Sequence, residues 1–276
     1  MAEPAYADIR WEDKAPPEAM PQVPPTEDEL PCDDGEPLET QRHKWQMDIL
    51  IDAMDLWLAE RGEGYTNGNM FVYFSLEQTR GRYFRGPDVF VVLGVPRGER
   101  KSWVVWEQGK APDVVIELLS ESTAAVDKGE KMQVYQDVMR VPEYFWMDPF
   151  NPEDRAGFRL IEGIYQPIER GQRGALVSRR LGLTLVLWSG AYRGIAGTWL
   201  RWATPEGDLL PTDAEAAHRL ADLETTRADA AEQRADAAVQ RAGEAERRAD
   251  EELRRANAER ARAERAEAEL ARLRNL

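Results

Sequence analysis

The chain has 276 residues, a formal net charge of −15 at pH 7 and a single cysteine, Cys32, which excludes an internal disulfide framework and is typical of a reducing compartment. The length is sufficient for one or two domains with a sizeable core. Because no apolar run approaches the roughly 18 residues that span a membrane, and the N-terminus lacks the pattern of a signal peptide, we expect a cytoplasmic protein with no membrane partner.

Residues 1–29 are rich in proline and acids. Such a composition buries too little apolar surface to offset the entropy lost on ordering. We therefore expect an acidic, disordered tail at residues 1–29, followed by the main domain at residues 30–212. Much of the negative charge lies at the start of the chain, since residues 1–39 hold 12 acids and 2 bases. The centre is nearly neutral, so charge neither favours nor excludes a DNA partner.

The main domain begins with a predicted helix. Residues 39–61 carry apolar side chains at a helical period, and the Arg61-Gly62 pair is a stop signal. The residues expected on the buried face of this helix are Trp45, Ile49, Ala53, Leu56 and Trp57.

A β-rich region follows this helix. Residues 64–75 alternate between apolar and polar side chains, with a turn at Asn67-Gly68. We expect a loop at residues 80–85 and then an apolar strand at residues 86–94, which reads GPDVFVVLG and opens with Pro-Asp.

Residues 112–149 contain the most informative pattern, PDVVIELLS, DKGEKMQVYQ and VPEYFWMDP, which predicts a buried strand, an amphipathic helix and a second buried strand. Glu117 is an acid between Ile116 and Leu118 in an otherwise apolar run. A buried carboxylate is costly unless it is paired, protonated or bound to a metal. A structural ion pair would give the same pattern as a functional site.

A metal site at Glu117 requires a second acid nearby. Asp113 lies on the same face of the strand but roughly 13 Å away, which is too far to share a metal ion. Asp88, at the start of the other Pro-Asp strand, is the better candidate, because two acids on adjacent strands hold Mg²⁺ for phosphate chemistry. Position 119, two residues after Glu117, holds leucine rather than lysine. Lys131 on the following helix could supply the cation, although a surface lysine would look the same.

The second half of the domain predicts further strands, at residues 157–161, 164–168, 181–188 and 198–202. We expect the last two to close the sheet. Strands that precede a strand–helix–strand unit favour the α/β class, with a mixed sheet flanked by helices.

Residues 213–276 are rich in alanine, glutamate and arginine, and arginine followed by alanine recurs every seven residues. This heptad array predicts a long helix. The alanines expected to form its seam are Ala228, Ala231, Ala235, Ala238, Ala242 and Ala245. A seam of alanines buries little apolar surface, so a solvated helix held by charge pairs and a coiled-coil dimer remain alternatives.

The order DGEPLET…H, PDVFVVLG, APDVVIELLS, D.GEK...Y and VPEYFWMDP resembles the Uma-type family of restriction endonucleases, within the PD-(D/E)XK nuclease superfamily. The resemblance runs from about Leu30 to Trp202. It implies a restriction-endonuclease-like α/β fold and phosphodiester hydrolysis that depends on a divalent metal, Mg²⁺ or Mn²⁺.

The resemblance also implies roles for four residues. Asp88 and Glu117 match the two metal-binding acids, and Lys131 matches a lysine that has moved from the strand to the next helix. Glu39 matches an acid at the head of the first helix. Where the family usually reads Ser-Pro-Ser-Thr after the strand, this chain carries an additional acid, Glu121, which is expected to repel phosphate.

The leading hypothesis is therefore a Mg²⁺-dependent endonuclease acting on DNA, with Glu39, Asp88, Glu117 and Lys131 as catalytic residues. One alternative is a catalytically silent nuclease-fold protein that acts as a binding or assembly module through its helical tail. Another is a structural coiled-coil adaptor. A homodimer could form through the core or through the tail.

Overall fold

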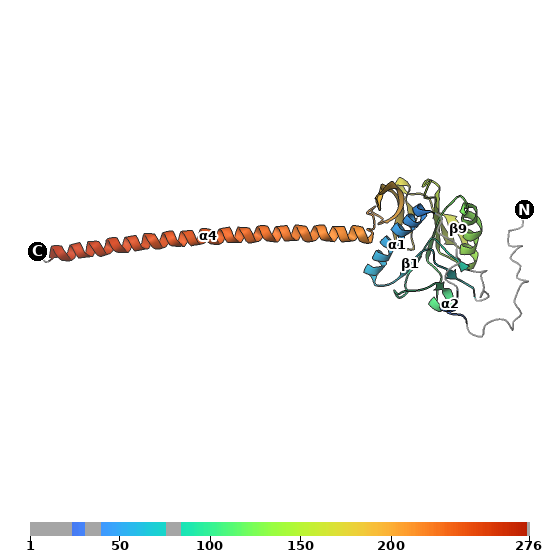
Figure 1. Ribbon diagram of the computed structural model, residues 1–276, viewed down its shortest axis with the longest axis horizontal. Helices are drawn as coiled ribbons and strands as arrows, with labels where there is room; N and C mark the ends of the chain where they lie inside the picture. The colour runs from blue at the N-terminus through green and yellow to red at the C-terminus, as the bar shows by residue number, and fades with distance from the viewer. Residues whose placement is uncertain (1–23, 31–39, 76–83, 275–276) are drawn as a thin grey trace, which may run out of the picture. The chain divides into compact units, whose positions relative to one another are not determined.

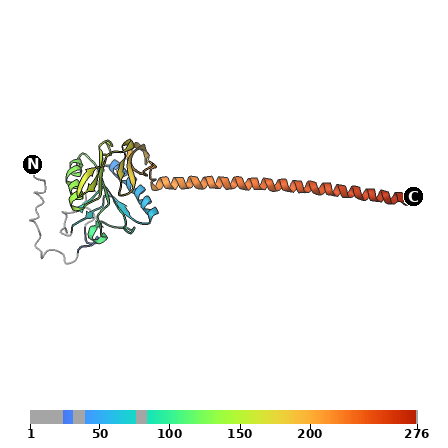
Figure 2. The ribbon, with the colours of Figure 1, turned by 180° about the vertical axis from the view of Figure 1, so that it is seen from behind.

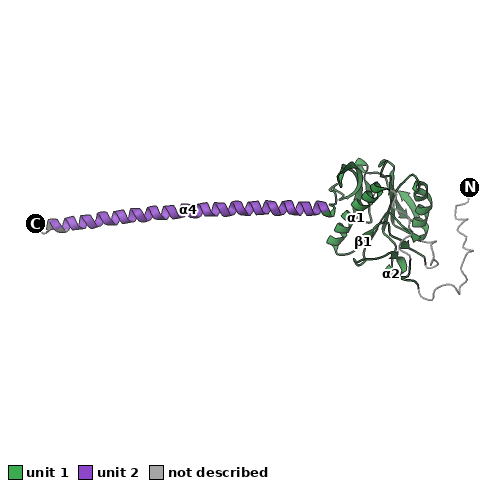
Figure 3. Cartoon of the chain, viewed as in Figure 1, with its two compact units in different colours: residues 1–213 green, residues 214–276 purple. Residues whose placement is uncertain are grey.

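The computed structural model describes residues 24–30, 40–75 and 84–274 (Figure 1), so Cys32 and Glu39 lie outside the described residues. The chain divides into two compact units, residues 1–213 and residues 214–276 (Figure 3). The first unit contains every described strand together with the shorter helices. The second unit consists of the long helix α4, which begins at the boundary and spans Asp213–Arg274.

The helices of the first unit are α1 (Gln41–Arg61), α2 (Val105–Gln108), α3 (Ala124–Val126), the π-helical segments η4 (Asp127–Lys131) and η5 (Val134–Val138), and the 3₁₀ turn η6 (Gln172–Gly174). The strands of the largest sheet are β1 (Tyr65–Asn67), β4 (Val89–Val92), β6 (Val114–Leu118), β7 (Glu143–Met147), β8 (Arg155–Ile161) and β9 (Ile164–Pro167). The remaining strands are β2 (Val72–Tyr73), β3 (Phe84–Arg85), β5 (Trp103–Val104), β10 (Leu176–Ser178), β11 (Leu183–Tyr192) and β12 (Ile195–Ala203).

The largest sheet of the described residues is mixed, with the order β1-β4-β6-β7-β8-β9. Its central pair, β6 and β7, is parallel, whereas the other neighbours are antiparallel. Parallel neighbours need a crossover connection, which residues 124–138 provide as a nearly continuous helical segment. The α/β class and the mixed sheet flanked by helices are therefore as predicted.

Helices cover the two faces of this sheet (Figures 1 and 2). Successive side chains of a strand point to opposite faces. Ile116 in β6 belongs to the core cluster that includes the buried residues of α1. Val115 belongs to the opposite cluster, with Tyr135 of η5. Glu117 shares the face of Val115 and therefore points towards the crossover helix.

Helix α1 begins and ends with the expected signals. The Thr40 side chain caps the N-terminus by accepting a hydrogen bond from the His43 N–H, and Gly62 ends the helix with a φ of 72°. The prediction of its buried face was only partly right, because Ile49 and Ala53 are buried whereas Trp45, Leu56 and Trp57 are half-buried. The helix also packs on β12, so its buried stripe is wide and includes Met47, Leu50, Met54 and Leu58.

Two strand predictions need correction. Residues 84–85 were expected in a loop but form β3, which pairs with β2. The strands β11 and β12 do not close the main sheet; together with β10 they form a separate three-stranded sheet. This sheet packs against α1 instead. Trp199, Leu200 and Trp202 of β12 belong to the same core cluster as the buried residues of α1.

Residues 24–30, the described part of the acidic N-terminal segment, contact the rest of the first unit. The Leu30 side chain is buried in a cluster with Phe71 and Val104, and the indole N–H of Trp106 donates to the Pro25 carbonyl at 2.9 Å. Residues 24–30 therefore pack against the small β3-β2-β5 sheet. Among the described residues, none of the helices has the length and hydropathy required to span a membrane.

Candidate metal and phosphate site

The candidate site lies where β4 and β6 run side by side. Their antiparallel register pairs Val89 with Ile116, so the next position along places Asp88 directly opposite Glu117. Asp88 precedes β4 and is half-buried, whereas Glu117 is completely buried. The carboxylate of Asp88 accepts the backbone N–H of Leu118 at 2.7 Å. The register of β4 and β6 thus brings the two acids on adjacent strands together.

Both oxygens of Glu117 have partners from the crossover helix. The buried hydroxyl of Tyr135 donates to Oε1 at 2.7 Å, and the ammonium of Lys131 donates to Oε2 at 3.2 Å. These contacts explain how an acid can stand in an apolar strand, because a buried carboxylate is tolerated when its oxygens are hydrogen-bonded.

The ammonium of Lys131 has a second carboxylate partner. Its Nζ lies 2.7 Å from Oδ1 of Asp127, an acid that is 1% exposed. Asp127, Lys131 and Tyr135 follow one another at intervals of four residues, which places them on one face of the helical segment. This segment contains two π-helical stretches, a conformation that is rare in proteins and often occurs at functional sites.

The carboxylate cluster changes the protonation behaviour of its members. Burial, together with the neighbouring Asp88 and Asp127, raises the pKa of Glu117 to about 8 against the opposing effect of Lys131. Burial likewise raises the pKa of Asp88 to about 6, although Lys131 and the Leu118 N–H oppose the rise. Near neutral pH the pair therefore holds about one proton, mostly on Glu117.

Lys131 stays charged in this environment. Burial disfavours its ammonium form, but the carboxylates of Glu117, Asp127 and Asp88 outweigh this effect and raise its pKa above the ordinary value. A permanent cation thus stands beside two acids that would otherwise repel each other.

The donor set fits a magnesium ion. Carboxylate oxygens are hard ligands, and Mg²⁺ is usually held by one or two carboxylates while several of its ligands remain water or phosphate. Asp88 and Glu117 satisfy this requirement. Within residues 24–30, 40–75 and 84–274, no group of three or more His, Cys, Asp or Glu side chains is arranged to hold a metal ion.

Of the residues singled out in the sequence, Asp88, Glu117 and Lys131 come together, and Glu39 lies outside the described residues. Asp113 lies elsewhere: its carboxylate is paired with Lys110 at 2.6 Å and with Arg180 at 2.6 Å. These pairs, together with the Leu93 N–H at 2.7 Å, give Asp113 a structural role at the other end of β6.

Other charged residues near the crossover helix are engaged away from the acids. Lys128 is paired with Asp154, with Nζ 2.7 Å from Oδ2. Glu121, the additional acid after the strand, is exposed on a turn. The ring of His43 is buried and hydrogen-bonded to the Leu119 carbonyl at 3.0 Å, so it links α1 to the end of the strand that carries Glu117.

Asp127 and Tyr135 stand in the D.GEK...Y pattern, but sequence reasoning gave neither of them a role at the site. Their signal is the spacing of four that they share with Lys131 on an amphipathic helix. An acid and a tyrosine at this spacing are ordinary on a helix surface, and they become informative only once Glu117 is known to face that helix.

This combination of a mixed α/β sheet flanked by helices, paired acids on adjacent strands and a nearby lysine defines a restriction-endonuclease-like protein. Residues 17–191 match the Uma2 family, described as "Putative restriction endonuclease". The chain belongs to this family, which confirms the resemblance found in the sequence.

Among solved structures, the chain is similar to one titled "Crystal structure of a putative nuclease belonging to DUF820 from Anabaena variabilis ATCC 29413", with a TM-score of 0.39 and 13% identity. The similarity covers 52% of this chain and 75% of that chain. None of the curated proteins matches the chain.

Proposed function

We propose that this protein is a divalent-metal-dependent endonuclease that hydrolyses phosphodiester bonds of DNA, with residues 30–212 as its nuclease domain and Mg²⁺, or Mn²⁺, as its cofactor. The observation that carries the proposal is the position of Asp88 opposite Glu117 on adjacent strands, beside the ammonium of Lys131. Membership of the Uma2 family supports it. The proposed place of action is the cytoplasm, which the single cysteine favours.

In this proposal each residue has a distinct task. Asp88 and Glu117 supply the carboxylate oxygens that hold the ion, and Tyr135 fixes the orientation of Glu117 through Oε1. Lys131 places a positive charge beside the site, where it stabilises the negative charge that develops on the phosphate. The bound ion supplies an activated water and neutralises phosphate charge. Glu39, two residues before α1, is proposed to assist.

The proposed metal site is tested by titrating the full chain with MgCl₂ in a calorimeter. We expect Asp88→Ala to weaken Mg²⁺ binding strongly while the thermal unfolding transition remains cooperative. Glu130→Gln is the matched control. Glu130 is exposed, lies on the helical segment that carries Lys131, and forms an ion pair with Arg85, which is not one of the proposed site residues. Equal Mg²⁺ affinity of wild type and Asp88→Ala would contradict the assignment.

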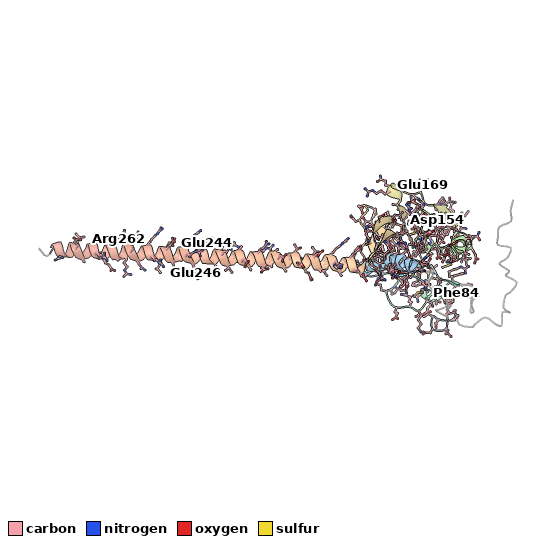
Figure 4. The ribbon with its side chains drawn as sticks, turned by 45° about the horizontal axis from the view of Figure 1, so that its top comes forward. Phe84, Asp154, Glu169, Glu244, Glu246 and Arg262 are labelled. Carbon is pink, nitrogen blue, oxygen red and sulfur yellow. The ribbon has the colours of Figure 1, made fainter. Side chains whose placement is uncertain are left out.

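A second function, assembly through the helical tail at residues 213–276, is favoured by the charges of α4. Large apolar side chains on α4 are exposed, namely Leu220, Leu223, Val239, Leu253 and Leu270. With the alanine seam at heptad positions a and d, the g positions are all arginine from residue 227 to residue 262. Charged side chains project all along the helix, as Glu244, Glu246 and Arg262 illustrate (Figure 4).

This charge pattern favours a parallel pair of helices. In a parallel coiled coil each g residue meets the e residue five positions further along the second copy, which pairs Arg227, Arg241 and Arg262 with glutamates. Arg255 would meet Arg260, an unfavourable pair. An antiparallel arrangement brings g against g, so arginine would meet arginine along the helix. The proposed partner is therefore a second copy of this chain in parallel orientation.

Light scattering of the full chain tests the assembly proposal. We expect a dimer mass for wild type and a monomer mass after Arg227→Glu, Arg241→Glu and Arg262→Glu are combined. Arg247→Glu with Arg254→Glu is the control, because these f positions face away from the seam. A monomeric wild type would refute the assembly proposal and leave the nuclease proposal unaffected.

A further inference from the structure

Lys131 is shared between two buried acids, and its contacts with them are unequal. Its Nζ lies 2.7 Å from Asp127 and 3.2 Å from Glu117. The lysine side chain is 21% exposed, so solvent reaches it only partly. A metal ion at Asp88 and Glu117 would compete with this ammonium for the carboxylate of Glu117, whereas the ion pair with Asp127 does not involve the proposed ligands.

We propose that Asp127 is a positioning residue that holds Lys131 in place when Glu117 turns from the ammonium to the metal ion. This inference rests on the proposed function, because it concerns the same site. Asp127 would keep the cation of Lys131 beside the phosphate and prevent it from occupying the place of the metal.

Asp127 is rigid enough for this task. Its backbone N–H donates to the Thr123 carbonyl at 2.9 Å, and its own carbonyl accepts the buried hydroxyl of Tyr144 at 2.8 Å. Its side chain is almost fully buried. A buried carboxylate on a backbone that is held at two points can direct a flexible lysine, because most of the adaptation falls to the four-carbon stem of the lysine.

The removal of Asp127 has a defined consequence. Without it, Glu117 is the acid that remains in an ion pair with the ammonium among the described residues, and Asp88 lies opposite Glu117. Lys131 would then oppose the metal ion more strongly. The effect of Asp127 on metal binding must therefore depend on the presence of Lys131.

Calorimetric titration with MgCl₂ alone, on the full chain, tests this dependence. The variants are Asp127→Asn, Lys131→Met and the combination of both, with Glu130→Gln as the control for the loss of one acid from the same helical segment. We expect Asp127→Asn to weaken Mg²⁺ binding by about tenfold, the scale of one close ion pair. In the Lys131→Met background the same substitution should change the affinity by less than about twofold. Glu130→Gln should leave the affinity unchanged.

The alternatives give different results. A persistent loss in the Lys131→Met background would overturn the inference, because Asp127 would then act on the ion directly. Unchanged affinity of Asp127→Asn would also overturn it, while wild-type Mg²⁺ binding would still support the proposed function. Failure of wild type to bind Mg²⁺ would refute the proposed function together with the inference.

A second measurement does not depend on the folding of any variant. In a crystal structure of wild type grown with CaCl₂, we expect Nζ of Lys131 in hydrogen-bond contact with Asp127 and released from Glu117. An ammonium that remains on Glu117, or that leaves both acids, would overturn the inference.

Discussion

Replacement of Glu117 by glutamine should stabilise the metal-free protein at alkaline pH. Burial and the neighbouring acids raise the pKa of Glu117 from 4.5 to about 8. Between these values the folded state holds a proton that the unfolded state has lost. The free energy of unfolding of wild type therefore falls as the pH rises through this window, and it is highest at its acidic end. Glutamine keeps the shape of the side chain and does not ionise.

The magnitude follows from the proton difference. One proton bound by the folded state alone changes the free energy of unfolding by about 1.4 kcal/mol per pH unit. Over the three pH units from 5 to 8, a full proton difference would amount to about 4 kcal/mol. Because Asp88 and Lys131 share in the charge balance of the site, we expect about half of this, an advantage of about 2 kcal/mol for the glutamine variant at pH 8 relative to pH 5. In a domain of this size, this advantage corresponds to a rise in Tm of about 4 to 8 °C.

Thermal and urea unfolding in the presence of EDTA, at several pH values from 5 to 8, measure this difference. Glu130→Gln is the control for the general effect of removing an exposed acid. A difference between Glu117→Gln and wild type that is the same at pH 5 and pH 8 would refute the reasoning, because it would show that Glu117 ionises normally in the folded state.

Three further predictions concern the same site. Tyr135→Phe leaves a buried oxygen of Glu117 without its donor, so urea unfolding at pH 8 should show a loss of about 1 to 3 kcal/mol; an unchanged midpoint would contradict the contact. Gly68→Ala should lower Mg²⁺ affinity by about tenfold or more in calorimetry, because an added Cβ would collide with the backbone carbonyl of Asp88. Gly129→Ala, which meets nothing within 4 Å, is its control, and retained affinity in Gly68→Ala would count against the placement of Asp88. Mg²⁺ affinity should rise from pH 6 to pH 8, because the ion must displace the proton held by the raised pKa of Glu117; a flat profile would argue against Glu117 as a ligand.

The sequence contained much of the site because the strands obey simple rules. An acid inside an apolar run stands out, and the shared Pro-Asp opening suggested that Asp88 and Glu117 lie on neighbouring strands. The face to which Glu117 points was not accessible from the sequence. Both faces of the strand are buried, so alternation gives no signal for its orientation.

The parts that could not be predicted depend on register and tertiary packing. The alignment of Asp88 with Glu117 follows from the pairing of Val89 with Ile116, and hydrophobic patterns do not determine such a register when every position is buried. Asp127 was missed for a related reason, since an acid on an amphipathic helix is usually exposed. The separate sheet of β10, β11 and β12 was also missed, because strands of either sheet have the same apolar pattern.

Cleavage of supercoiled plasmid DNA tests the central claim most directly. Wild type and Glu117→Ala are incubated with MgCl₂, with MnCl₂ and with EDTA, and Glu130→Gln serves as the control for a neighbouring acid. We predict nicked or linear product with wild type and with Glu130→Gln in either metal, none in EDTA, and a loss of at least about a hundredfold in Glu117→Ala. Equal cleavage by wild type and Glu117→Ala would contradict the account, because hydrolysis would then not depend on the acid pair between β4 and β6.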